Sequence, residues 1–217
     1  MRLRFSPRRY FIENFARKAA LSLGESSKVL DAGAGPCPYK KYFSHCNYEA
    51  MDFKKLNDNI NFVSSLDKIP RKSESYDAVL STEVLEHVEY PQKVVNEMHR
   101  ILKKNGKLFM TCPLAWKVHQ EPYNYFYFTK FGLKSLLKNA GFKKYKISPM
   151  GGYFFFLADT LKTDYVLNQY SGNIFYWPIR VITYPFNQII IPFLSFYFDK
   201  LDKTKEYTMG YLVEAIK

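Results

Sequence analysis

The chain has 217 residues, of which 47% are hydrophobic and 24% are charged. This balance suits one α/β domain with a sizeable core and excludes an intrinsically disordered chain. The formal net charge of +12 favours an anionic partner, such as a phosphorylated substrate, nucleic acid or an acidic membrane surface.

The cysteines and the N-terminal segment bear on the compartment. The three cysteines form no C-x-x-C pair, so the sequence predicts neither a disulfide framework nor a zinc site. The basic segment 2–9 is followed by Glu13, Arg17 and Lys18, which interrupt any apolar run and argue against a secretory signal. We therefore expect a cytoplasmic protein.

Residues 7–23 predict an amphipathic helix. Phe11, Phe15, Ala19 and Leu23 recur at a spacing of four and form one apolar face. Such a helix either docks on the sheet or forms a lid over the ligand site. The sequence leaves both alternatives open.

The segment from 28 to 38, KVLDAGAGPCP, predicts a buried strand that runs into a glycine-rich turn. In open α/β sheets this turn holds a nucleotide-like cofactor. Gly33 and Gly35 can adopt positive φ and carry no Cβ, so a ligand can approach the backbone. A nicotinamide fingerprint would need a third glycine where Pro38 stands, which argues against a dinucleotide.

The strand predicted over 47–53 ends on Asp52, close to where a doubly wound fold places the acid that binds ribose hydroxyls. A carboxylate suits this role because its two oxygens can accept from two vicinal hydroxyls. The alternative is a solvated acid in a turn. With the glycine turn upstream, ribose binding is the favoured interpretation.

Further elements follow in an alternating order. The pattern predicts strands over 61–64, 75–82, 107–112, 143–148 and 206–216, with helices over 91–103 and from the N-cap Thr129 to Leu137.

Residues 151–205, between the last two predicted strands, form an apolar insertion rich in aromatic residues. The stretch 181–198 carries no charge, but Pro185, Asn187, Gln188 and Pro192 argue against a membrane-spanning helix. Two alternatives stay open. The insertion is a helical cap over an acceptor pocket, or it is a cap that also contacts a membrane surface or forms a homodimer interface.

Several motifs in this order resemble the class I S-adenosylmethionine (SAM)-dependent methyltransferases of the type-11 group. They are DAGAG at 31–35, YD at 76–77 with VLEHV at 84–88, and HQEPYNYFYFT at 119–129. The resemblance implies one domain over 1–217, SAM as cofactor, and a Rossmann-like α/β fold. That fold is a seven-stranded, mostly parallel sheet with helices on both faces and a helical insertion before the last strand.

The resemblance also implies a cofactor site. Asp31, with the turn Gly33, Ala34 and Gly35, would hold the amino-acid end of SAM, and Asp52 with Phe53 would hold the ribose. The adenine would lie near Ser65 and Leu66, although the family usually carries an acid or amide at the position of Ser65. The methionine part would be lined by a group at the end of the fourth strand and just after it, namely Ser81, Thr82, Glu83 and His87.

His119 and Glu121 are candidate catalytic residues on a loop expected to cover the carboxyl ends of the strands. His119 is either a general base for a hydroxyl acceptor or a histidine that orders the loop by bonding to Glu121. His87 alternatively caps its turn and bonds to backbone. It is not an obvious metal ligand, because no partner stands at ligand spacing in the sequence, and no metal is expected.

The sequence therefore predicts a methyltransferase that acts on a small-molecule, saccharide or lipid-linked acceptor, with oxygen favoured as the acceptor atom. No nucleic-acid partner is expected, because the aromatic residues do not interleave with basic ones. Peripheral contact with the inner membrane surface through 151–205 stays an alternative. The rival from another class is a catalytically degenerate protein that uses this fold to dock a partner.

Overall fold

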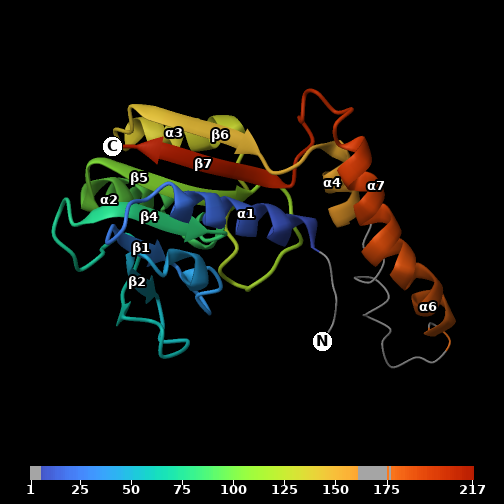
Figure 1. The fold of residues 1–217 in the computed structure, drawn as a ribbon, viewed down its shortest axis with the longest axis horizontal. Helices are drawn as coiled ribbons and strands as arrows, with labels where there is room; N and C mark the ends of the chain where they lie inside the picture. The colour runs from blue at the N-terminus through green and yellow to red at the C-terminus, as the bar shows by residue number, and fades with distance from the viewer. Residues whose placement is uncertain (1–5, 161–174, 176) are drawn as a thin grey trace. The chain divides into compact units, whose positions relative to one another are not determined.

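The computed structural model describes residues 6–160, 175 and 177–217 (Figure 1). The predictions for the start of the basic N-terminal segment and for 161–174 and 176 of the insertion fall outside these residues. The chain divides into two compact units. One comprises 12–148 and 210–217, and the other comprises 1–11 and 149–209.

The larger unit is built on a seven-stranded sheet with the order β3-β2-β1-β4-β5-β7-β6 (Figure 1). The strands β1 to β5 pair in parallel, and β7 runs antiparallel to β5. This is the predicted mostly parallel, Rossmann-like sheet. The strands are β1 Lys28–Ala32, β2 Asn47–Asp52, β3 Phe62–Val63, β4 Tyr76–Thr82, β5 Leu102–Pro113, β6 Lys144–Pro149 and β7 Gly210–Ile216.

Helices cover both faces of this sheet because successive strand side chains alternate between them. Val29 and Phe109 belong to a core with α1 (Pro7–Leu21), where Phe15 meets Phe109 edge to face at 6.1 Å between ring centroids. Leu30 and Leu108 point to the other core, which contains α2 (Pro91–Ile101) and α3 (Lys130–Asn139). Docking of α1 through Phe15, Ala19 and Ala20 confirms the first of its two predicted roles.

Two short 3₁₀ helices complete this unit. They are η1 (Lys40–Phe43), which follows β1, and η2 (Leu85–His87), which follows β4. Thr129 caps α3 as predicted, because its Oγ1 accepts a hydrogen bond from Gly132 N at 3.1 Å.

Several predicted boundaries are wrong: the last strand, expected over 206–216, begins at Gly210, and the junction between α2 and β5 also differs. The helix expected over 91–103 ends at Ile101, and β5 begins at Leu102, which pairs with Tyr76. The next paired residues are Ala78 and Lys107, so residues 103–106 are inserted between the two pairings. Asn105 takes φ of 63° there, a left-handed conformation that asparagine tolerates better than most residues.

The smaller unit is helical in its described part, as predicted for the insertion. Its elements are α4 (Tyr153–Thr160), α6 (Trp177–Pro185), the π-helix η4 (Phe186–Ile190) and α7 (Ile191–Phe198). The buried Arg8 side chain donates to Met209 O at 3.0 Å and pairs with Asp159 at 3.5 Å. Within the described residues, none of the helices has the length and hydropathy needed to cross a membrane.

Candidate functional site

The candidate cofactor site lies at the carboxyl ends of β1, β2 and β4. The turn after β1 is tied to β2 by backbone hydrogen bonds, because Gly33 N and Ala34 N both donate to Met51 O at 3.0 Å. Gly35 N donates to Asp52 Oδ2 at 2.8 Å. The structure therefore brings together the predicted glycine turn and Asp52.

The two glycines of the turn do different work. Both have positive φ, 82° at Gly33 and 53° at Gly35. A Cβ at Gly33 would lie 2.6 Å from Val84 Cγ2, so Val84 already occupies that space. A Cβ at Gly35 would meet nothing within 4 Å. The predicted close approach of a ligand therefore fits Gly35, whereas Gly33 lets the segment after β4 pack against the turn.

Asp31, at the end of β1, is a buried carboxylate with an unused oxygen. Its Oδ2 accepts from the Tyr48 hydroxyl at 2.5 Å, and its Oδ1 has no hydrogen-bond partner among the described residues. Burial, opposed by the Tyr48 hydroxyl and assisted by the charge of Asp52, raises the pKa of Asp31 to about 7. An ammonium group of a ligand would supply the missing donor and favour the ionised carboxylate.

Asp52 is 5% exposed, so the alternative of a solvated turn acid is wrong. Its oxygens accept from two backbone amides, Gly35 N and Phe53 N, both at 2.8 Å. Each carboxylate oxygen has a second lone pair, so this anchoring leaves acceptor capacity for ribose hydroxyls. The neighbouring Phe53 ring is 65% exposed. Ribose binding by Asp52 and Phe53 stays a prediction.

The predicted adenine residues have different surroundings. Ser65 is exposed and its hydroxyl donates to Asp67 Oδ1 at 2.5 Å. Leu66 is buried in the core that contains α2 and α3. An acid, Asp67, therefore lies two residues after the position where the family usually carries one. The adenine contact itself stays a prediction.

The end of β4 and the segment after it carry the residues expected around the methionine part of the cofactor. Ser81 is buried, and its Oγ has no hydrogen-bond partner in the described part of the chain. Thr82 is half-buried at the end of β4. Glu83 takes φ of 52° and its carboxylate accepts from Thr111 Oγ1 at 2.9 Å. Such a backbone conformation costs energy in a non-glycine residue and is common at functional sites.

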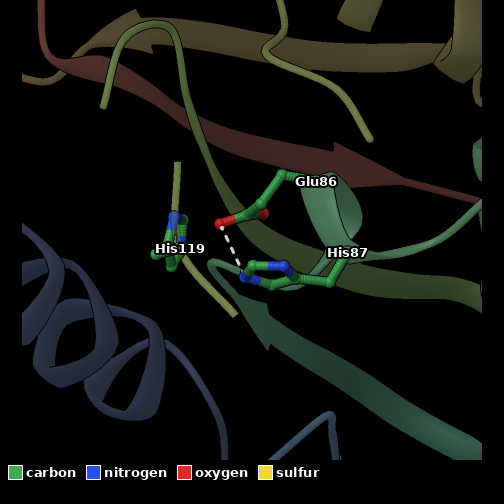
Figure 2. A group of neighbouring side chains, drawn as sticks. All are labelled: Glu86, His87 and His119. Atoms are coloured by element: carbon green, nitrogen blue, oxygen red, sulfur yellow. Dashed lines mark ion pairs between the residues drawn. The ribbon is translucent and has the colours of Figure 1, made fainter. Parts of the chain in front are cut away.

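Three further side chains gather beside this segment: Glu86, His87 and His119 (Figure 2). One ligand atom from each lies within 4.8 Å of the others. His87 Nε2 is 3.7 Å from Glu86 Oε1, and the two imidazole rings meet edge to face at 4.8 Å between centroids. We call these three residues the His–Glu cluster.

The loop after β5 is fastened over the cluster by backbone groups. Tyr125 N and Phe126 N donate to Glu86 O at 2.8 and 3.3 Å. His87 Nδ1 bonds to Tyr123 O at 2.5 Å, which fits the expectation that His87 bonds to backbone, although the partner lies far along the chain rather than in its own turn.

One of the alternatives for His119 is wrong. Its expected partner, Glu121, is exposed, and no hydrogen bond joins the two within the described residues. His119 Nδ1 instead bonds to Lys117 O at 3.0 Å, and the acid near its ring is Glu86. The structure therefore separates the two predicted catalytic residues, since only His119 belongs to the cluster. Whether either is catalytic stays a prediction.

Burial controls the charges around the cluster. It lowers the pKa of His87, an effect opposed by the bond to Tyr123 O and reinforced by His119. Burial also raises the pKa of the Cys112 thiol, with Glu86 and Glu83 adding to the shift. His87 therefore favours its neutral form and Cys112 stays a thiol.

Sequence reasoning missed Tyr48 and Glu86. No pattern in the sequence singles out Tyr48, because it reaches Asp31 only through the pairing of β1 with β2, in which Val29 lies opposite Tyr48. Glu86 stood inside the VLEHV motif and could have been singled out as a charged residue between apolar ones. Its burial shows only in the fold.

Comparisons with known proteins agree with this geometry. Residues 30–110 match the model of the family described as methyltransferase domain. No curated protein sequence matches the chain.

Solved structures share the fold at low identity. A SAM-dependent methyltransferase from Archaeoglobus fulgidus is 14% identical, with 96% of this chain and 94% of that chain covered and a TM-score of 0.64. Phosphoethanolamine N-methyltransferase 2 from Haemonchus contortus, in complex with SAM, is 13% identical, with 97% and 56% covered and a TM-score of 0.58. The cyclase SpnF is 14% identical, with 94% and 81% covered and a TM-score of 0.61.

The fold alone leaves the reaction open, because a cyclase shares it. The family match is more specific, since residues 30–110 run from β1 to β5 and include the glycine turn, Asp52 and the His87 segment. An unused oxygen on Asp31 and open space at Gly35 also fit a cofactor that carries an ammonium group. Residues 30–110 therefore match a methyltransferase domain, and the chain has the fold of SAM-dependent methyltransferases.

Proposed function

We propose that the protein transfers a methyl group from SAM to a hydroxyl of a saccharide or lipid-linked acceptor. The observation that carries the cofactor half of this proposal is the buried Asp31 carboxylate, whose Oδ1 lacks a partner among the described residues. Asp31 would accept a hydrogen bond from the α-ammonium of SAM, Gly35 would leave room for the methionine part of SAM, and Asp52 would bind the ribose.

Methyl transfer needs alignment more than activation, because the sulfonium is already a good leaving group and the methyl carbon is attacked in line. An acceptor hydroxyl also has to lose a proton. The His–Glu cluster supports this step. His119 Nδ1 bonds to a carbonyl that can only accept, so Nδ1 carries the proton and Nε2 is left with a lone pair. His119 Nε2 would take the acceptor proton.

The charge of +12 and the smaller unit support an acceptor presented at an anionic lipid surface. From 177 to 198 the sequence has no acidic residue. Large apolar side chains on α6, η4 and α7 are exposed, among them Trp177 at 66%, Ile182 at 73% and Phe193 at 72%. Apolar side chains of this size in a basic protein suit insertion into the interface of a membrane.

The cofactor assignment is tested by calorimetric titration of the purified protein with SAM, S-adenosylhomocysteine and NADH. We expect saturable binding of the first two and none of the third. Binding of NADH alone would support an oxidoreductase. If none of the three binds, the protein is better explained as a partner-docking module on a methyltransferase fold.

The membrane assignment is tested by cosedimentation with vesicles of phosphatidylcholine, with and without phosphatidylglycerol. We expect binding that requires the anionic lipid and weakens as salt is raised, because the attraction is electrostatic. Ile182→Glu and Phe193→Glu should each reduce binding several-fold. Phe131→Glu is the matched control, since Phe131 is 77% exposed on α3 of the larger unit. Equal loss in all three variants would contradict the proposal.

A further inference from the structure

The geometry points to a divalent transition-metal site formed by Glu86, His87 and His119. Two imidazoles and one carboxylate offer ligand atoms within 4.8 Å of one another (Figure 2). This set of two nitrogen ligands and one oxygen ligand is typical of Zn²⁺, Mn²⁺ and Fe²⁺ sites that keep open coordination positions. Glu86 and His87 come from η2 after β4, and His119 comes from the loop after β5.

The hydrogen bonds of the two histidines prepare the lone pairs that a metal needs. His87 Nδ1 faces Tyr123 O at 2.5 Å, and His119 Nδ1 faces Lys117 O at 3.0 Å. A carbonyl oxygen can only accept, so both Nδ1 atoms carry protons and both neutral rings have their lone pair on Nε2. Metal-binding histidines are commonly fixed in this way, with the second nitrogen bonded to a backbone carbonyl.

The surroundings of His87 Nε2 support the same conclusion. The atom is buried and has no hydrogen-bond partner in the part of the chain that the structure describes. It lies 3.7 Å from Glu86 Oε1. A neutral nitrogen lone pair and a carboxylate oxygen do not attract each other, whereas a cation between them would supply the partner that His87 Nε2 lacks and would also attract the carboxylate. The simple alternative is a protonated His87 that forms an ion pair with Glu86.

The spacing suits a metal ion after a small adjustment. Ligand atoms lie about 2.0–2.2 Å from Zn²⁺, so two ligands of a tetrahedral ion are about 3.4 Å apart. The Glu86–His87 separation of 3.7 Å is close to this value. The widest separation, 4.8 Å or less, would have to shorten, and His119 is the half-buried residue of a loop segment whose neighbours Val118 and Gln120 are exposed. Cys112 does not belong to this group of ligand atoms.

A bound ion would change how the acceptor loses its proton, and this role rests on the proposed function. With both Nε2 atoms engaged, His119 could not act as the base. The ion would instead bind the acceptor hydroxyl at an open position and lower its pKa, so that the hydroxyl proton could pass to solvent water as the methyl group is transferred. Binding of the ion itself does not depend on methyl transfer.

The test is calorimetric titration of chelator-treated protein with ZnCl₂ and with MnCl₂, in the absence of SAM. We expect one saturable site for at least one of the two ions. His119→Ala and Glu86→Gln should each weaken it at least about tenfold, since even the loss of a supporting second-sphere group has an effect of this size. Thermal unfolding of each variant checks that the larger unit still folds.

The chain offers matched controls in its other two histidines. His45 bonds to Ala20 O and His99 packs on Phe142, so neither belongs to the cluster. His45→Ala and His99→Ala should keep the site. Absence of saturable binding, or equal loss in the control variants, would overturn the proposal. A protein that binds SAM but neither ion would overturn the metal site alone, whereas one that binds an ion but not SAM would overturn only the methyltransferase function.

Discussion

Replacing Asp31 by asparagine should abolish most SAM binding while making the protein more stable at alkaline pH. The carboxylate is the acceptor that we expect for the α-ammonium of SAM. Loss of a charged hydrogen bond in a buried site costs about 1.5–3 kcal/mol, or roughly ten- to 150-fold in Kd. Calorimetric titration with SAM measures this loss.

The pH dependence of the unaltered protein tests the same residue. The pKa of Asp31 lies near 7, so the carboxyl gains its proton as the pH falls. Between pH 7 and pH 5.5 the α-ammonium of SAM stays charged, and Kd should rise about 15-fold because the ionised fraction of Asp31 falls by about that factor. Asp31→Asn should show no such dependence. The other ionisable groups around Asp31 are Tyr48, Asp52 and Cys37.

The folding stability of the protein should depend on pH in the opposite direction to its SAM affinity. A folded-state pKa raised from 3.8 to about 7 means that the folded protein binds this proton more tightly than the unfolded chain, so stability is lost as the pH rises through this range. At pH 8 the penalty is as much as about 4 kcal/mol. The asparagine amide that replaces the carboxyl would itself lack an acceptor, and this costs about 1–3 kcal/mol, which offsets part of the gain. Asp31→Asn should therefore gain about 2 kcal/mol at pH 8, and the gain should shrink towards pH 4.

Asp77→Asn is the control for both measurements. Asp77 lies near the start of β4, away from the carboxyl ends of the strands, and accepts from Lys103 Nζ and Lys28 N. These partners, which outweigh burial, lower its pKa, so this variant should lose stability and keep its SAM affinity. If Asp31→Asn binds SAM as well as the unaltered protein does, Asp31 is not the ammonium acceptor.

Alanine substitutions at the two glycines of the turn should separate folding from cofactor binding. Gly33→Ala places a Cβ 2.6 Å from Val84 Cγ2 in a backbone with φ of 82°. The left-handed conformation costs about 1–2 kcal/mol and the overpacking about 1–3 kcal/mol. We expect a loss of about 3 kcal/mol in the free energy of unfolding, measured with urea. Adding Val84→Ala should recover the packing part.

Gly35→Ala should lose only the conformational cost of about 1–2 kcal/mol, because its Cβ meets no atom within 4 Å. The same Cβ would project into the open space proposed for the cofactor, so Kd for SAM should rise more than tenfold. Gly24→Ala is the matched control, since its nearest neighbour would be Ser27 Oγ at 3.9 Å. If Gly35→Ala binds SAM normally, the cofactor does not pass over this turn.

The sequence alone determined the elements whose residues interact with near neighbours. Lys28–Ala32 is a strand, as predicted for the start of the segment 28–38, because a short apolar run before turn residues leaves few alternatives. Thr129 caps α3 through a bond to a residue three positions later. The resemblance carried by the order of these elements and by the motifs at 31–35 and 84–88 predicted the sheet, and it implied SAM as the cofactor.

Only the tertiary structure decided which distant residues meet. The spacing of the sequence favoured Glu121 as the partner of His119, whereas the fold brings Glu86 to it, because the loop after β5 is bonded to the backbone of Glu86. Likewise Val84 fills the space at Gly33, and Tyr48 reaches Asp31 across two paired strands. Such contacts depend on strand pairing and on how side chains fill space between elements. Local propensity and residue spacing do not determine strand pairing or the packing of side chains between elements.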